Sequence, residues 1–381
     1  MPLSDPDILF AITGDPRYNS RALKQLEVLT AAGYDVHVVG LAAAPASEML
    51  YERIRLQLLE RPSGGGPKFF WQTHQLFSAY VAGVKARAYH ASDLYVLPAL
   101  SGRVKKTGGK LVYDARERYP YVASTVGRPW ARFFWEMLES RHIRRADSVF
   151  TVSQSIASHI AASYNIALPD VLYNVPAFKK AVPSEQLRET LDIAVSQTVI
   201  LHQGKMQKSR GCLLLLQAMQ HVAGATLVFL GDGPLRQPLE VAVAQYGLQD
   251  RVKFKAAVLP DELHAFTCSA DIGVTLLEDT CLNHRYALPN KLFEYLMAGV
   301  PVLGSDLPEV GGVIEDYGVG RVVDASDPAQ IGAVLQEMVD APADRAKWAA
   351  ASPAVFETFN WENASQVLRR NYKNLIPVPE Q

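Results

Sequence analysis

The sequence has few cysteines, no long apolar run and almost no net charge, and each absence excludes a class of protein. Three cysteines, Cys212, Cys268 and Cys281, lack metal-type or redox-type spacing, which favours reduced thiols. No run approaches the roughly 20 apolar residues of a membrane-spanning helix, and the first ten residues carry no secretory-signal pattern. The 38 basic and 39 acidic residues leave no general positive field for nucleic acid. We therefore expect a cytoplasmic protein that binds no nucleic acid.

What is present is an alternation of short β-branched or aromatic runs with longer helical patterns. The strand-like runs are residues 7–13, 35–41, 110–115, 148–153 and 170–174 in the first half, and 198–204, 226–232, 251–256, 271–277, 300–305 and 321–324 in the second. Helical patterns such as 20–32 and 213–221 separate them. This rhythm predicts βαβ units and parallel sheets. Because each half has its own series, we expect an α/β protein with two Rossmann-like domains.

The domain boundary is expected within residues 174–186, where prolines and lysines interrupt both patterns. We predict a first domain over 1–178 and a second over 186–357. Ligands of open α/β sheets bind at the carboxyl ends of the strands. Two such domains facing each other across a cleft can therefore bring a donor held by one to an acceptor held by the other.

The segment LPNKLFEYLMAGVPVLGSDLPE, residues 288–309, predicts a helix that leads directly into a strand. Pro289 suits the first turn of this helix and Gly299 its C-terminal cap. Lys291 and Glu294 lie three residues apart and share one face. A polar face at a helix N-terminus suits a diphosphate, and a carboxylate one turn deeper suits the hydroxyls of a ribose. The alternative is an ion pair on the surface of an amphipathic helix.

Two further segments follow strand-like runs directly. HQGKMQKSRG, residues 202–211, places Lys205 and Arg210 at a turn between strand and helix, where cations can neutralise a diphosphate leaving group. In LGDGP, residues 230–234, small residues allow the backbone to approach a ligand closely. The alternatives are a solvated basic loop for the first and a tight turn without a ligand for the second.

These three segments, in this order and spacing, resemble the donor domain of the retaining GT-B glycosyltransferases of family 4. Lys205 and Arg210 match the family's pair of phosphate-binding residues, and Glu294 matches the second glutamate of its paired-glutamate motif. The sequence at 231–233 matches its glycine-rich loop. Residues 13–40 and 146–160 look like segments of the N-terminal domain, and 359–375 looks like the C-terminal helix that crosses back onto it. The resemblance thus implies that 358–381 belongs with the first domain.

The sequence departs from the family pattern at two positions. Tyr286 stands where the first glutamate of the pair is expected, so Asn283, His284 or backbone groups are candidates for its contacts to the sugar. In YDARERYP, residues 113–120, Arg116 stands where relatives commonly have histidine. Its guanidinium suits an anionic group on the acceptor or on an acidic donor sugar. The alternative is a structural salt bridge to Glu117 or Asp93.

The resemblance implies a set of site residues, which fall into three groups. The expected catalytic residues are Lys205, Arg210, Arg116 and Glu117; the expected donor-binding residues are Gly14, Gly204, Gly231, Asp232, Gly233, Asn283, His284, Tyr286, Pro289, Asn290, Lys291, Leu292 and Glu294; and the acceptor-side candidates are His90 and Asp93. For His90 a structural role is the alternative. The family resemblance also implies front-face displacement without a protein base, a metal ion or a cofactor.

The expected function is that of a retaining hexosyltransferase that uses a UDP- or GDP-linked sugar. Its acceptor is expected to be a glycan or a lipid-linked glycan in surface polysaccharide biosynthesis. A sugar-nucleotide epimerase of the same fold and a non-catalytic sugar-nucleotide-binding subunit are the alternatives. Residues 127–147 combine four aromatic residues with five arginines, a pattern that fits either peripheral contact with the inner membrane surface or an ordinary packed helix.

Overall fold

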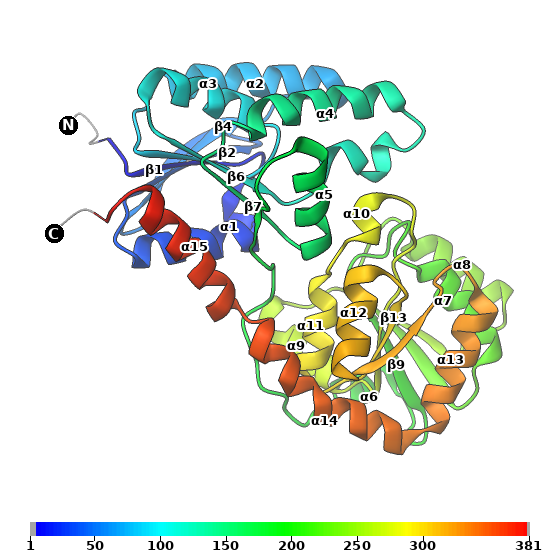
Figure 1. Ribbon diagram of the computed structural model, residues 1–381. Helices are drawn as coiled ribbons and strands as arrows, with labels where there is room; N and C mark the ends of the chain where they lie inside the picture. The colour runs from blue at the N-terminus through cyan, green and yellow to red at the C-terminus, as the bar shows by residue number, and fades with distance from the viewer. Residues whose placement is uncertain (1–4, 379–381) are drawn as a thin grey trace. The chain divides into compact units, whose positions relative to one another are not determined.

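The computed structural model describes residues 5–378 and divides into two compact units (Figure 1). Unit 1 comprises Met1–Asn174 and Glu362–Gln381, and unit 2 comprises Val175–Trp361. The division therefore falls at the start of the proline- and lysine-rich segment. Residues 1–4 and 379–381, which the predicted domain ranges include, lie outside the described part of the chain.

Unit 1 contains an eight-stranded sheet with the order β3-β4-β2-β1-β5-β6-β7-β8. All neighbouring strands are parallel except β3 and β4. The strands are β1 (Ile8–Ala11), β2 (Val36–Ala42), β3 (Ala46–Tyr51), β4 (Ile54–Glu60), β5 (Ala88–Ala91), β6 (Lys110–Ala115), β7 (Ser148–Thr151) and β8 (Asp170–Val171). The chain order reverses between β1 and β5, which is where open sheets of this kind bind ligands.

Helices cover both faces of this sheet. They are α1 (Ser20–Ala31), α2 (Gly66–Ala82), α3 (Leu97–Thr107), α4 (Pro129–Ile143), α5 (Gln154–Tyr164) and α15 (Trp361–Leu375), with short 3-10 turns at Pro16–Tyr18, Tyr119–Tyr121 and Ala123–Thr125. In Figure 1, α2, α3 and α4 lie over one face and α1 and α15 over the other. The Tyr372 hydroxyl on α15 shares a hydrogen bond with Nδ1 of His90 on β5, so this helix packs within unit 1.

Unit 2 contains a six-stranded parallel sheet with the order β11-β10-β9-β12-β13-β14. In chain order this is the 3-2-1-4-5-6 arrangement of dinucleotide-binding folds, which reverses between β9 and β12. The strands are β9 (Thr198–Gln203), β10 (Ala225–Leu230), β11 (Val252–Lys255), β12 (Ile272–Thr275), β13 (Val302–Ser305) and β14 (Gly320–Val323). The expected α/β fold with two Rossmann-like domains is confirmed, and every predicted strand run overlaps an observed strand.

The helices of unit 2 also form two layers. They are α6 (Gln186–Leu191), α7 (Cys212–Ala218) with a 3-10 turn at Met219–His221, α8 (Arg236–Gln245), α9 (Pro260–Cys268), α10 (Leu282–Arg285), α11 (Asn290–Met297), α12 (Pro308–Tyr317), α13 (Pro328–Asp340) and α14 (Pro342–Thr358). Figure 1 places α7, α8 and α13 on one side of the sheet and α9, α11 and α12 on the other. Among the described residues, no helix has both the length and the apolar character that crossing a membrane requires.

Candidate active site

A cavity of about 430 Å³ lies in unit 2 where the chain order of the sheet reverses. Its walls come from the turn after β9, the first turns of α11 and one residue of α9. The lining residues are Gln203, Gly204, Lys205, Gln207, Arg210, Leu263, Pro289, Asn290, Lys291 and Glu294. Two sequence segments about 80 residues apart, each predicted to bind the donor, thus converge on one cavity.

Three of the residues that line this cavity are basic: Lys205, Arg210 and Lys291. Burial lowers the pKa of Lys291 to about 7, and the positive charge of Arg210 acts in the same direction. Lys291 is the second residue of α11, at the end of the helix that carries partial positive charge. This arrangement attracts an anion, because an anion relieves the repulsion among the cations and stabilises the protonated form of Lys291.

We predict that binding of UDP is accompanied by uptake of a proton on Lys291. In the free protein burial lowers the pKa of Lys291 to about 7, and a bound diphosphate should raise that pKa. Affinity should therefore fall as pH rises from about 7 to 9, by at most tenfold per unit for one proton. Calorimetry in two buffers of different ionisation enthalpy measures the uptake, and Lys291→Met should abolish it. Equal affinity at pH 7 and pH 9 in the wild type would contradict the assignment.

Glu294 is held in place by the end of β9. Its Oε2 accepts a hydrogen bond of 2.6 Å from Nε2 of Gln203, whose Oε1 in turn accepts one of 2.9 Å from Thr267 on α9. Gln203 is buried, whereas Glu294 lies partly exposed in the cavity wall. The carboxylate is thereby oriented while its surface remains accessible to a ligand.

The glycines after β9 and β10 allow two loops to pack closely. Gly204, Gly231 and Gly233 all have positive φ, and the Gly204 amide donates to the carbonyl of Leu230 at 2.9 Å. A Cβ on Gly231 would collide with the backbone of Gly204, and a Cβ on Gly233 would lie 2.8 Å from the Met206 nitrogen. These glycines therefore have a packing role beside the cavity, and Asp232 lies between them.

The other expected donor residues have different surroundings. Asn283 and His284 belong to α10 and Tyr286 follows it, and none of them lines the cavity. His284 shares a 2.7 Å hydrogen bond with Thr280, which donates to Ser209 in the turn after β9 at 3.2 Å. This turn carries Arg210, so α10 is linked to the cationic loop. Leu292 is fully buried in α11, and we leave its side chain out of the proposed site.

In unit 1, Asp93 joins the loops on either side of the reversal point. Its carboxylate accepts hydrogen bonds of 2.7 Å from both the backbone amide and the hydroxyl of Thr13, the residue before Gly14. It also accepts from the amides of Tyr95 and Val96. Asp93 is buried, and these hydrogen bonds hold the loop after β1; its expected acceptor-side role stays a prediction.

A guanidinium nitrogen of Arg116 lies 3.5 Å from a carboxylate oxygen of Asp93. This is the salt bridge that the structural alternative for Arg116 predicted. Burial acts to lower the pKa of Arg116, but Asp93, Tyr119, Asp114 and Glu117 together raise it. The guanidinium is therefore charged, and its Nε has no hydrogen-bond partner among the described residues. Glu117 is exposed. The Arg116 side chain is 20% exposed beside this salt bridge, so part of it remains accessible from the surface.

The surroundings of His90 favour a structural role over the expected acceptor-side role. Its ring is fully buried, stacks on Phe10 and shares a 2.8 Å hydrogen bond with the Tyr372 hydroxyl. Burial lowers its pKa to about 4, so the imidazole is neutral at pH 7. These contacts are those expected of the structural alternative, and an acceptor-side role for His90 stays a prediction.

Three cavity residues were not predicted: Gln203, Gln207 and Leu263. Gln203 is the last residue of a buried strand beside the reversal point, and that position was the available signal. Leu263 lies on α9, and this helix reaches the cavity through packing that no sequence motif indicates. Within residues 5–378, no group of three or more histidine, cysteine or acidic side chains is arranged to hold a metal ion.

Comparison with known protein families divides the chain at nearly the same place. Residues 18–173 match the model of the glycosyl transferase 4-like domain, and residues 183–355 match that of the glycosyl transferases group 1. The first match lies in unit 1. The second lies in unit 2 and contains every residue that lines its cavity.

Curated relatives are similar over part of their length. The chain is 27% identical over 212 residues to lipopolysaccharide 1,2-N-acetylglucosaminetransferase of Salmonella typhimurium, covering 51% of this chain and 53% of the relative. It is 26% identical over 246 residues to D-inositol 3-phosphate glycosyltransferase of Xylanimonas cellulosilytica, covering 60% of this chain and 57% of the relative. The chain thus matches just over half the length of these relatives.

Solved structures resemble the whole chain. Sucrose-phosphate synthase from Thermosynechococcus elongatus has a TM-score of 0.79 at 18% identity, covering 97% of this chain and 98% of that one. Anabaena HepE in complex with UDP-glucose has a TM-score of 0.74 at 16% identity, covering 97% and 100%. At this identity the similarity establishes the fold. Together with the two matched domains, it identifies the chain as a member of the GT-B glycosyltransferases of the family-4 type.

Proposed function

We propose that the protein is a retaining glycosyltransferase that takes a hexose from a UDP- or GDP-linked donor in the cavity of unit 2. The supporting observation is the convergence of Lys205, Arg210 and Glu294 on one cavity at the reversal point of the sheet. The bond from the sugar C1 to the β-phosphate oxygen breaks while the acceptor oxygen attacks the same face. The acceptor proton passes to the leaving phosphate oxygen, and Lys205 and Arg210 stabilise its charge.

The acceptor that we propose is a glycan or a lipid-linked glycan of a surface polysaccharide. Relatives named for lipopolysaccharide synthesis support this choice, since one is a lipopolysaccharide core biosynthesis glycosyltransferase of Rhizobium meliloti, 27% identical over 183 residues. We further propose that the protein works in the cytoplasm and touches the inner membrane surface through α4, which exposes aromatic side chains.

A panel of UDP- and GDP-sugars tests the reaction, with and without candidate acceptors. We expect one donor to release its nucleoside diphosphate, and we expect NMR of the product to find the donor's anomeric configuration retained. Conversion of the donor sugar without nucleotide release would identify an epimerase. Binding of a donor without any turnover would identify a non-catalytic subunit.

We predict that Glu294→Ala weakens binding of free UDP or GDP as well as of the intact donor. The proposed partner of Glu294 is the ribose, and losing a hydrogen bond to a charged group costs about 1.5–3 kcal/mol. Calorimetry should therefore find affinity reduced about 10- to 100-fold. Glu315→Ala, which removes an exposed acid from α12, is the matched control and should have no effect. Equal affinity in wild type and Glu294→Ala would contradict the proposed contact between Glu294 and the ribose.

We predict that Arg116→Lys lowers transferase activity while the melting temperature holds. Lysine keeps the charge opposite Asp93 but loses the planar fork of donors that suits a carboxylate or phosphate. Activity is measured for wild type and variant with an anionic substrate and with a neutral one. The loss of activity should be smaller with the neutral substrate. A fall in melting temperature with unchanged activity would instead assign Arg116 a structural role.

A further inference from the structure

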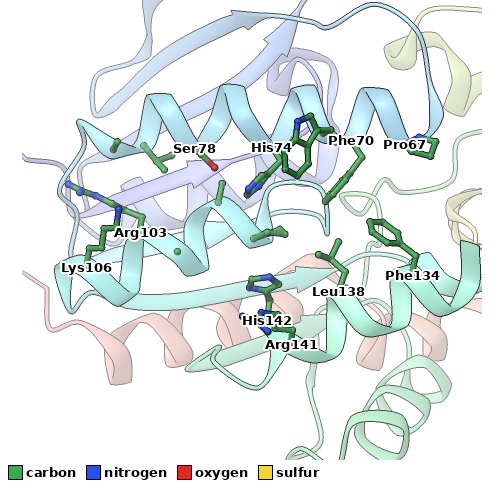
Figure 2. A pocket seen from close by; sticks show the side chains of 16 residues that line it. Pro67, Phe70, His74, Ser78, Arg103, Lys106, Phe134, Leu138, Arg141 and His142 are labelled. Atoms are coloured by element: carbon green, nitrogen blue, oxygen red, sulfur yellow. The ribbon is translucent and has the colours of Figure 1, made fainter.

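Unit 1 contains a second cavity, which lies between α2, α3 and α4 (Figure 2). Its volume of about 760 Å³ falls within the range of small-molecule sites. The walls are largely apolar: Phe70 and Trp71 come from α2, and Phe134 and Leu138 come from α4. None of the residues assigned to the donor or the acceptor lines it. The chemistry of these walls suits a hydrocarbon chain.

One end of this cavity carries positive charge. Arg103 and Lys106 of α3 lie together at that end, opposite the end formed by Phe134 and Pro67, and Arg141 lines the cavity from α4 (Figure 2). No acidic side chain lines the cavity to neutralise them. The cavity therefore pairs an apolar length with a cationic end, which is the complement of an anionic amphiphile.

The neighbouring histidine does not contribute to this charge. Burial lowers the pKa of His142 to about 4, and the nearby Arg145 and Arg141 act in the same direction. The imidazole is therefore neutral at pH 7, and the positive charge along the cavity comes from Arg103, Lys106 and Arg141.

Helix α4 presents an exposed apolar stripe beside the cavity. Trp130, Phe133 and Met137 are 65%, 66% and 53% exposed, and their spacing places them on one face of the helix. In contrast, Phe134 and Trp135 of the same helix pack edge-on against Phe70. The segment is thus both a packed helix and a surface with unburied aromatic residues, as expected of a helix at a bilayer interface.

We propose that the cavity between α2, α3 and α4 binds one hydrocarbon chain of an anionic phospholipid from the bilayer, with the phosphate at the end that carries Arg103 and Lys106. The inference rests on the proposed membrane contact of α4 for its source of lipid. It does not depend on the donor chemistry of unit 2. Occupation of the cavity would anchor unit 1 at an anionic membrane in a defined orientation.

Gly102 offers a way to fill the cavity without disturbing the fold. This residue lines the cavity from within α3, and a Cβ added there would meet no heavy atom within 4 Å. Gly102→Phe places a ring in the cavity, and Gly102→Ala is its matched control. Both variants should keep or raise the melting temperature, because glycine weakens a helix interior.

The direct probe is lysophosphatidylglycerol, a single-chain anionic phospholipid, titrated below its micelle concentration and followed by tryptophan fluorescence. We expect wild type and Gly102→Ala to bind it saturably and Gly102→Phe to bind at least about tenfold more weakly. Lysophosphatidylcholine, with the same chain and a zwitterionic head group, should bind more weakly to the wild type. The double variant Arg103→Gln/Lys106→Gln should lose about tenfold or more of this preference, and Lys105→Gln on the same helix should retain it.

Vesicles of 30% phosphatidylglycerol in phosphatidylcholine give the second readout, and UDP binding gives the third. Gly102→Phe should weaken vesicle binding but leave UDP affinity unchanged, which separates this inference from the proposed transfer. Equal lysophosphatidylglycerol affinity in the Phe and Ala variants would overturn it. So would equal affinity for the two lysolipids, or vesicle binding by wild type with no saturable binding of the single-chain probe.

Discussion

Replacing Glu139 by glutamine is expected to reduce the stability of unit 1 by about 3–5 kcal/mol, because it leaves Arg118 buried without its counter-charge. Both side chains are fully buried, and the Glu139 carboxylate accepts hydrogen bonds from Arg118 and from the hydroxyls of Tyr113 and Tyr164 at 2.8 and 2.7 Å. Glu139 also links α4 to the sheet, because Tyr113, which donates a hydrogen bond to it, lies on β6. Urea unfolding, with the transition of unit 1 followed separately from that of unit 2, measures the loss.

The same helix carries its own control for this experiment. Glu136 forms a 3.0 Å ion pair with Arg132, but both side chains are substantially exposed to solvent. Glu136→Gln should therefore change stability by no more than about 0.5 kcal/mol, as is usual for exposed pairs four residues apart on a helix. If Glu139→Gln reduced the free energy of unfolding no more than Glu136→Gln does, the buried ion pair would not be a main source of stability for α4.

The double variant Lys205→Ala/Arg210→Ala is expected to reduce turnover the most. Each cation is proposed to stabilise the leaving diphosphate, and each lost charged hydrogen bond costs about 1.5–3 kcal/mol. Single variants should therefore lose about 10- to 100-fold in kcat/KM and the double variant about 100-fold or more. Donor affinity should fall as well, because the ground-state diphosphate makes the same contacts.

Lys208 provides the matched control, since it is an exposed lysine in the same turn that does not line the cavity. Lys208→Ala should retain wild-type rate and affinity. The melting temperature should be similar in Lys205→Ala and Lys208→Ala, because both lysines are exposed. Unchanged rate and donor affinity in both single variants would contradict the proposal that Lys205 and Arg210 bind the diphosphate.

The two sheets were predictable because their strands are buried on both faces and read as short apolar runs separated by helical patterns. No strand run was predicted for the hairpin of β3 and β4 or for β5. Most residues of β3 are exposed at the edge of the sheet, so its sequence has no clear apolar pattern. Gly299 was predicted to cap the helix before it, and it has a positive φ just beyond α11, which ends at Met297.

The sequence predicted that Lys205, Arg210, Lys291 and Glu294 would lie together, but not the environment of the acceptor-side candidates. Motifs at strand ends placed Lys205, Arg210 and Glu294 together because a parallel sheet brings its carboxyl ends to one edge. The burial of His90 depends on Tyr372, which lies 282 residues further along the chain. Local patterns contain no information on contacts of that sequence separation, and the same holds for the buried pair of Arg21 and Asp114, 93 residues apart.

The most direct test of the account is an experimental structure of the protein with bound UDP or GDP. We predict the nucleotide in the cavity of unit 2, with its diphosphate within hydrogen-bond distance of Lys205 and Arg210 and its ribose hydroxyls on Glu294. Lys291 should lie near the phosphates at the start of α11. A nucleotide bound elsewhere, or bound in this cavity without contact to either Lys205 or Arg210, would contradict the proposed donor site.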